Sequence, residues 1–284
     1  MHQRILGHTD LEVSAIGLDA TAFPMPRSRL LRTAAAIDAS PAAHTLIAAV
    51  DHEINVLDVS GVHEPFEQDY LGHALEPRRR HFTVIGGFQS HWACEPYERR
   101  TERLLGILDR LRTNHLDVLS MIVQHDDAVG TEDLLRSDLL DWAEEMIRRG
   151  YARFTGISLA SSDNAAAFVS SDRFDIMLAS YRIVHESLTT QGVSASLLGE
   201  ARRLGMGVLT NNVPALSVLE QLVQNMSPDV DAREARRIAV SILFELPQVH
   251  ASLMGVQTPA EISHFCELVP TAASTGAWFE HVDE

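Results

Sequence analysis

The feature that most constrains the fold of this chain is a regular alternation of short apolar runs with amphipathic segments along its whole length. Eight runs are rich in β-branched residues or leucine, which is typical of strands that are buried on both faces. They lie near 15–18, 54–59, 83–87, 116–123, 153–158, 176–180, 207–210 and 252–256. Strands that alternate with helices favour a parallel sheet, and eight such pairs favour a closed (β/α)8 TIM barrel. Periodicity alone leaves a doubly wound open sheet as an alternative.

Capping residues mark the expected helices. Ser40 followed by Pro41 is typical of an N-cap and a first helical residue. Gly150 follows an apolar stripe over 138–149, as expected for a helix end. Further helices are expected after Glu95–Pro96, over 231–246, and over 30–35 within a long loop at 21–37.

Size and charge restrict the class of protein. The 284 residues suit one barrel domain over 1–284, and no linker or low-complexity tract divides them. The net charge of −16 disfavours nucleic acid and anionic membranes as partners, because both carry negative charge. The first ten residues lack the apolar region of a signal peptide, so we expect a cytoplasmic protein. The composition leaves open whether the protein is a monomer or a homo-oligomer.

Lysine and cysteine usage excludes several kinds of site. All 23 basic residues counted as Lys or Arg are arginine, so no Schiff base, lysine acid or phosphate-binding lysine is available. Cys94 and Cys266 are the only cysteines and form no CxxC pair, which disfavours a disulfide framework or a thiolate zinc site.

Five segments resemble the aldo-keto reductases, in order and at the spacing of that family. The longest is RILGHTDLEVSAIGLDAT at 4–21, and the others are HEINVLDVS, LGHAL, the run over 105–119 and RGYARFTGIS. The resemblance covers essentially the whole chain. It implies a barrel closed at the bottom by an N-terminal β-hairpin, and NADP(H)-dependent carbonyl reduction by a tetrad of Asp, Tyr, Lys and His.

Only part of this tetrad carries over to the sequence. The family aspartate falls on Asp58, and the tyrosine, five residues further on, falls on His63. The lysine place falls on Phe88. His125 matches the family histidine only if the strand before it absorbs two extra residues.

The cofactor contacts that the resemblance implies are also incomplete. Ser158 and Tyr181 are kept, but leucine stands at 159 and 178 where the family has asparagine and glutamine. Phe265 replaces an asparagine that often meets adenine. These losses indicate a barrel that has abandoned hydride transfer, so no cofactor is favoured and NADP(H) is the alternative.

Residues at the carboxyl ends of the strands are the site candidates, because barrel active sites lie there. The predicted catalytic residues are Asp58, His63 and His125. The predicted substrate-binding residues are Asp19, Phe88, Trp92, Tyr181, Arg182 and Asn211, and the cofactor residues, if NADP(H) binds, are Ser158 and Tyr181.

Each candidate has a structural alternative. Asp58 follows a buried run, where a carboxylate must be hydrogen-bonded or act as an acid or base, but it could be a relic held by backbone amides. His63 and His125 could be exposed loop residues, and Arg182 could form a surface ion pair. Phe88 and Trp92 could serve packing alone. A metal among the histidines is disfavoured, because these strand ends carry no HxH pair.

Three hypotheses for function follow. The favoured one is cofactor-independent acid/base chemistry on a small carbonyl compound, such as dehydration, isomerisation, cyclisation or lyase cleavage. A role in secondary metabolism is compatible with this hypothesis. The second is an NADP(H) oxidoreductase with an altered tetrad, in which Asp58 works with His63 as proton donor. The third is a catalytically silent barrel that acts as a partner subunit or a ligand sensor.

Overall fold

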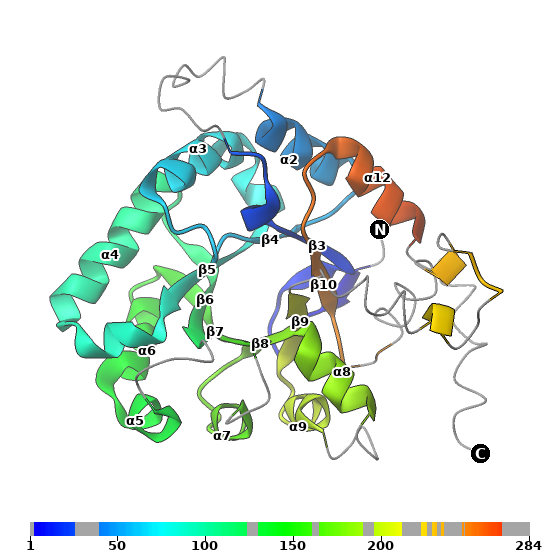
Figure 1. Cartoon of the computed structure of the whole chain (residues 1–284). Helices are drawn as coiled ribbons and strands as arrows, with labels where there is room; N and C mark the ends of the chain where they lie inside the picture. The colour runs from blue at the N-terminus through cyan, green and yellow to red at the C-terminus, as the bar shows by residue number, and fades with distance from the viewer. Residues whose placement is uncertain are drawn as a thin grey trace.

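Eight parallel strands form a closed barrel, and helices surround it (Figure 1). The structure is a computed structural model that describes residues 3–25, 40–123, 130–160, 165–189, 196–211, 223–225, 229–231, 234–235, 246 and 248–268. Around the barrel the strand order is β10-β3-β4-β5-β6-β7-β8-β9. The closed order confirms the predicted (β/α)8 barrel and excludes the doubly wound sheet.

The barrel strands lie close to the predicted runs. Their bounds are β3 Ile16–Asp19, β4 Val56–Asp58, β5 Thr83–Gln89, β6 Leu116–Val123, β7 Ala152–Leu159, β8 Ile176–Ser180, β9 Gly207–Asn211 and β10 Ala251–Met254. The one difference that matters for the site is β5, which continues two residues beyond the predicted end, to Gln89.

The helices begin and end largely where capping residues predicted. The Ser40 hydroxyl accepts a hydrogen bond from the Ala43 amide, and Gly150 follows α6 with a φ of +79°. The helical segments are η1 Ala20–Ala22, α2 Pro41–Asp51, α3 Pro65–Leu75, η2 Glu76–His81, η3 Ser90–Cys94, α4 Tyr97–Arg110, α5 Thr131–Arg136, α6 Asp138–Arg148, α7 Ala165–Val169, α8 Tyr181–Thr189, α9 Leu197–Arg203 and α12 Pro259–Leu268. The helix expected over 30–35 lies outside the described residues, as does most of 231–246. Among the described helices none combines the length and the apolar character that a bilayer crossing requires.

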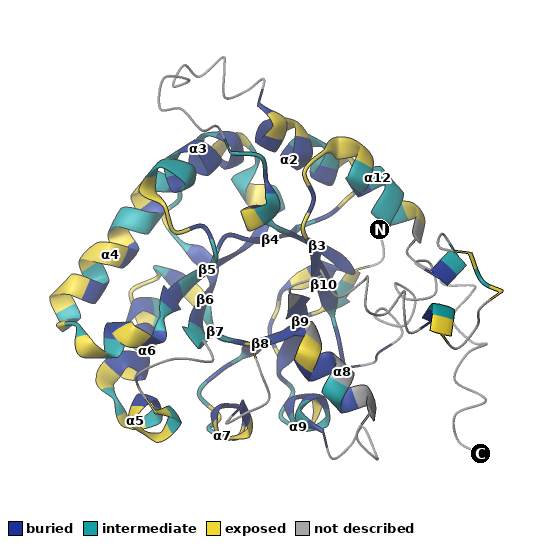
Figure 2. Ribbon diagram, viewed as in Figure 1, coloured by how far each residue is buried: buried dark blue, intermediate teal, exposed yellow. Residues whose placement is uncertain are grey.

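Two apolar clusters lie on opposite sides of the barrel wall, and Figure 2 shows the buried strands inside a ring of half-exposed helices. The larger cluster fills the space between strands and helices. The smaller one lies inside the barrel, where Val56, Val118 and Ile176 contact Leu6 and Val13 of the N-terminal segment. Strands β1 (Gln3–Ile5) and β2 (Glu12–Ser14) pair antiparallel in that segment. The hairpin therefore closes the amino-terminal end of the barrel, as the resemblance implied.

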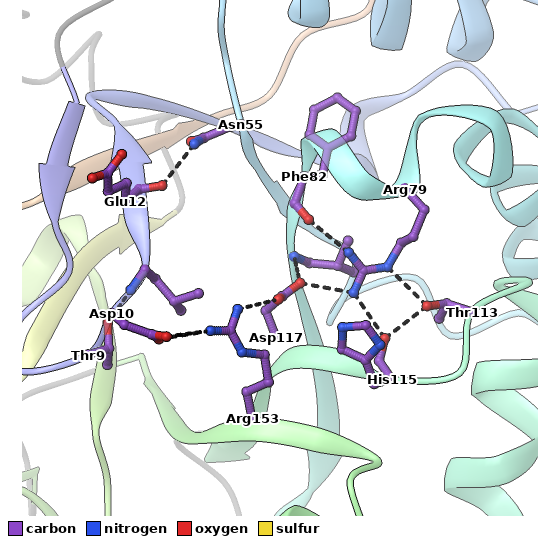
Figure 3. A network of polar contacts seen from close by, with 12 residues as sticks. Thr9, Asp10, Glu12, Asn55, Arg79, Phe82, Thr113, His115, Asp117 and Arg153 are labelled. Atoms are coloured by element: carbon purple, nitrogen blue, oxygen red, sulfur yellow. Dashed lines mark hydrogen bonds and ion pairs between the residues drawn. The ribbon is translucent and has the colours of Figure 1, made fainter.

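A network of charged residues ties this hairpin to the barrel (Figure 3). Its centre is Asp117, which accepts hydrogen bonds from the Val84 amide at 2.9 Å and from Arg79 at 2.9 Å. Arg153 donates to Asp117 at 3.2 Å and to Asp10 of the hairpin turn at 2.8 Å. The network lies at the end opposite to the strand carboxyl ends, where polar contacts in barrels stabilise the fold and take no part in catalysis.

Candidate active site

Because successive side chains of a strand point to opposite faces, the residues that face the barrel interior show which side chains at the strand ends face the barrel axis. Val56 lies inside the barrel, so Asp58 lies on the same side two residues later. A Cβ added to Gly17 would meet side chains of the inner cluster, which puts Asp19 at the same mouth. Ser158 follows Phe154 and Gly156 on the inner face of β7. The structure therefore brings Asp19, Asp58 and Ser158 to one end of the barrel.

Asp19 and Asp58 are paired neighbours on strands β3 and β4. Asp58 is 5% exposed, and its Oδ1 accepts a hydrogen bond from the Ser60 amide at 2.8 Å. Asp19 is partly exposed and accepts from the amide and the hydroxyl of Thr21, at 2.9 and 2.6 Å. The described residues place two carboxyl groups side by side and give neither of them an ion pair.

This environment changes the acidity of Asp58. Its pKa is raised from 3.8 to about 7: burial is the largest cause, the hydrogen bonds from Ser60 act in the opposite direction, and the negative charge of Asp19 contributes a small rise. A carboxyl group that exchanges its proton near neutral pH can act as a general acid or a general base. The sequence predicted that a buried aspartate here is hydrogen-bonded or acts as an acid or base, and the hydrogen bond is present.

A cleft of about 450 Å³ opens beside this pair. Ser60 joins the two, since it lines the cleft and its amide binds Asp58. His63 lines the cleft and is exposed, so it lies at the rim of the barrel mouth. The lining residues are Val59, Ser60, Val62, His63, Pro65, Gln68, Gly86, Gly87, Gln89, His91, Trp92, Arg103, Ile107 and Arg110.

Phe88 and Trp92 belong mainly to the core between the barrel and helix α6. Phe88 is 2% exposed and meets Trp142 edge-on, with ring centroids 5.3 Å apart. Because Ile85 faces the barrel interior, strand alternation puts Gly87 and Gln89 inside and Phe88 outside. Phe88 therefore does not face the mouth, contrary to its assignment as a substrate-binding residue, and serves packing instead. Trp92 packs on Trp142 at 5.9 Å and also lines the cleft.

The remaining predicted residues are placed only in part. Tyr181 begins α8 and Asn211 ends β9, at the carboxyl ends of β8 and β9, but their side chains lie outside the described part of the chain. His125 also lies outside the described residues. Arg182 is exposed and forms an ion pair with Glu186 at 2.9 Å, which is the alternative that the sequence left open. Within the described residues no three His, Cys, Asp or Glu side chains gather as metal ligands do.

Sequence reasoning missed Ser60, Gln68, Arg103 and Arg110, which line the cleft. Ser60 could have been found from its place two residues after Asp58, where a backbone amide commonly binds an aspartate side chain. Arg103, Ile107 and Arg110 are spaced i, i+4 and i+7 along α4, so the two arginines lie on one face of this helix. An arginine pair on one helical face of an acidic chain was the available signal.

The ends of β7, β8 and β9 carry donors suited to a nicotinamide. Ser158, Tyr181 and Asn211 stand at these strand ends, and serine, tyrosine and asparagine are residue types that can bind a nicotinamide by hydrogen bonds or stacking. The turn after β10 suits a phosphate less well. There the Gln257 amide donates to the Glu261 carboxylate at 2.9 Å, and the Glu261 amide donates to the Thr258 hydroxyl at 3.3 Å. The residue types at these strand ends thus suit the nicotinamide end of NADP(H), and Glu261 binds the Gln257 amide just before α12.

Comparison with solved structures identifies the fold. No protein-family model matches the sequence, and no curated protein sequence matches it significantly. The holo form of an aldo-keto reductase from Bacillus halodurans superposes with a TM-score of 0.71 at 16% identity, covering 97% of this chain and 94% of that one. A Klebsiella pneumoniae aldo-keto reductase in complex with NADPH gives 0.69 at 16% identity, covering 96% and 93%. Another from the same organism, in complex with NADP and acetate, gives 0.65 at 16%, covering 92% and 89%.

These neighbours correct one expectation from the sequence. The sequence favoured a barrel without a cofactor, but structural neighbours that cover most of the chain were solved with NADP or NADPH. That expectation is wrong. The chain has the aldo-keto reductase fold.

Proposed function

We propose that this protein is an NADP(H)-dependent oxidoreductase that interconverts a small carbonyl compound and its alcohol, with Asp58 in place of the proton-donating tyrosine. The observation that carries the proposal is the position of Asp58. It is a buried carboxyl group with a pKa of about 7 at the carboxyl end of a barrel strand. The fold around it is shared with proteins solved with NADP or NADPH.

Asp58 holds the proton that a carbonyl oxygen needs when negative charge develops on it. The Ser60 amide binds Oδ1, and in the proposed reaction Oδ2 carries the proton. Ser60 also fixes the orientation of the carboxyl group, and burial keeps the pKa high enough for the acid to be populated near neutral pH. Bound NADPH would supply the hydride, and Ser158, Tyr181 and Asn211 would hold its nicotinamide. His63 is exposed and lines the cleft beside Ser60, where it can contact a bound substrate.

Nicotinamide fluorescence and aldehyde-dependent NADPH consumption test the proposal together. We expect NADPH to bind the wild type and Asp58→Asn alike, because the substitution lies away from the nicotinamide donors on β7 to β9. We expect Asp58→Asn to lower turnover by about 10²- to 10⁴-fold, the usual contribution of a general acid. Reduction by the wild type should decline above about pH 7, where Asp58 loses its proton.

Asp19→Asn is the matched control, because it removes a neighbouring charge and leaves the acid in place. Its turnover should persist, and its decline should begin at lower pH than in the wild type, since Asp19 raises the pKa of Asp58. Failure of NADPH and NADP⁺ to bind at millimolar concentration would overturn the proposal. Full turnover in Asp58→Asn would remove Asp58 from the reaction.

A further inference from the structure

The cleft beside Asp58 has a charge opposite to that of the chain. The chain carries a net charge of −16, yet among the described residues the cleft lining contains Arg103, Arg110, His63 and His91 and no Asp or Glu. The remaining polar lining is neutral, from Ser60, Gln68 and Gln89. A positively charged cleft on an acidic protein attracts small anions that the rest of the surface repels.

Arg110 is the residue that gives the cleft its unbalanced charge. Its Nε donates to Gln68 Oε1 at 2.7 Å, and Gln68 Nε2 donates in turn to the Val62 carbonyl oxygen at 2.8 Å. Gln68 is 5% exposed, so this pair fixes the guanidinium against the helix. No carboxylate pairs with Arg110 in the described part of the chain.

The other arginines of this region contrast with Arg110. Arg103 donates to Glu95 at 2.8 Å and lies over the ring of Trp92, with its Cζ 5.5 Å from the centroid. Arg100 is buried and pairs with Asp138 at 2.8 Å. Only Arg110 of these three combines half-burial in the cleft with a guanidinium whose Nη1 and Nη2 face no acidic partner among the described residues. A fixed guanidinium with two donors left matches the two oxygens of a carboxylate or phosphate.

Ser60 links the cleft to Asp58, which does not itself line the cleft. Ser60 contacts the cleft and binds Asp58, and Gly87 lies on the inner face of β5 beside it. A Cβ added to Gly87 would come within 2.8 Å of the Ser60 Cβ. A molecule held at Arg110 can therefore extend along Ser60 toward the Asp58 carboxyl group.

We propose that the substrate is a carbonyl compound that carries an oxyanion, either a carboxylate or a phosphate ester. Arg110 binds the oxyanion, Gln68 orients Arg110, and His63 and His91 contribute further donors at the rim. The inference rests on the proposed function, since it names the substrate class of the same site. On this proposal, substrate choice is determined by the loops after β4 and β5 and by helix α4.

Matched pairs of aldehydes test the substrate class. Succinic semialdehyde against butanal tests a carboxylate, and phosphorylated glyceraldehyde against glyceraldehyde tests a phosphate. We expect the wild type to prefer the anionic member of at least one pair by about tenfold or more in kcat/KM, the size of one charge-assisted contact. Arg110→Gln should lower that preference by about tenfold, mainly through KM, and added salt should weaken it.

Arg99→Gln is the matched control, because Arg99 lies on the same helix, is 60% exposed at its side chain, pairs with Glu102 and does not line the cleft. It should keep the wild-type preference. A preference equal in wild type and Arg110→Gln, or absent in both pairs, would overturn the inference.

Binding measured without turnover separates this inference from the proposed function. We expect succinate, but not the uncharged succinamide, to bind the wild type by calorimetry, and we expect Arg110→Gln to lose this binding while Arg99→Gln keeps it. If succinate binds through Arg110 and no aldehyde is reduced, the anion site stands and the oxidoreductase proposal fails. If neutral aldehydes are reduced and succinate does not bind, the oxidoreductase proposal stands and the anion site fails.

Discussion

Replacing Asp58 by asparagine should stabilise the protein at high pH and destabilise it slightly at low pH. Folding raises the pKa of Asp58 from 3.8 to about 7, chiefly through burial. Between these two values the folded protein holds a proton that the unfolded chain releases, so the stability of the wild type falls as pH rises. Below about pH 4 both states are protonated at Asp58, and this contribution disappears.

The size of the effect follows from the pKa difference. A difference of about 3 units corresponds to about 4 kcal/mol of lost stability once Asp58 is ionised in both states, at about 1.4 kcal/mol per unit. Asparagine never ionises and keeps an oxygen that can accept the Ser60 amide. Its NH2 group needs a new partner, at a cost of about 1 kcal/mol that does not depend on pH. The net gain should therefore reach about 3 kcal/mol above neutral pH.

Urea unfolding of the wild type and Asp58→Asn at about pH 5 and about pH 8.5 measures this gain as a difference between variants, in which the titration of all other groups cancels. Asp19→Asn is the second variant, and it should recover only a small part of the gain, because the Asp19 charge is the smallest of the causes that shift Asp58. An equal stability difference at both pH values would refute the reasoning, since it would mean that Asp58 is not held protonated by the fold.

Three further predictions concern the stability of the barrel and the binding of the cofactor. Asp117→Ala should lower stability by about 3 kcal/mol in thermal unfolding, because it removes the carboxylate that pairs with the largely buried Arg79 and binds the buried Val84 amide. Arg153→Ala, at 40% side-chain exposure, should cost about 1 kcal/mol or less, and equal losses would contradict this. Gly7→Ala should destabilise more than Gly150→Ala in the same assay. Both have positive φ, but a Cβ at Gly7 would collide with the Gly207 amide while Gly150 is open. Glu261→Gln should tighten NADPH binding by nicotinamide fluorescence, because a carboxylate then no longer faces a phosphate at the start of α12; unchanged or weaker binding would place the phosphates elsewhere.

Most of the fold could be predicted from the sequence because the signals are local. A parallel barrel strand is a short apolar run between polar turns, and a helix start such as Ser40–Pro41 is set by its own backbone chemistry. These signals depend on a few adjacent residues. The strand bounds and the caps agree with the structure for that reason.

The orientation of side chains on those strands could not be predicted in the same way. Barrel strands are apolar on both faces, so the sequence VIGGFQS does not say whether Phe88 or Gln89 faces the axis. A shift of one residue along the strand moves a side chain from the barrel interior to the outer face. Phe88 was predicted to contact substrate, but it lies on the outer face and packs against Trp142. The cleft was missed for a different reason. Gln68 and Arg110 are 42 residues apart, and only the packing of α3 on α4 brings them into contact.

Two aspartates show why one end of the barrel can carry chemistry and the other cannot. Asp58 and Asp117 are equally buried, at 5% exposure each. Asp117 is bound by two arginines and a backbone amide, which leaves its charge fully compensated. Within the described residues, Ser60 is the donor that binds Asp58, and a second carboxyl group is its neighbour. In the family that the sequence resembles, a lysine stands by this aspartate, and a chain without lysine provides no such cation. For the proposed reaction the missing lysine therefore matters twice, because one catalytic residue is gone and Asp58 has no ammonium group beside it that would hold its pKa down.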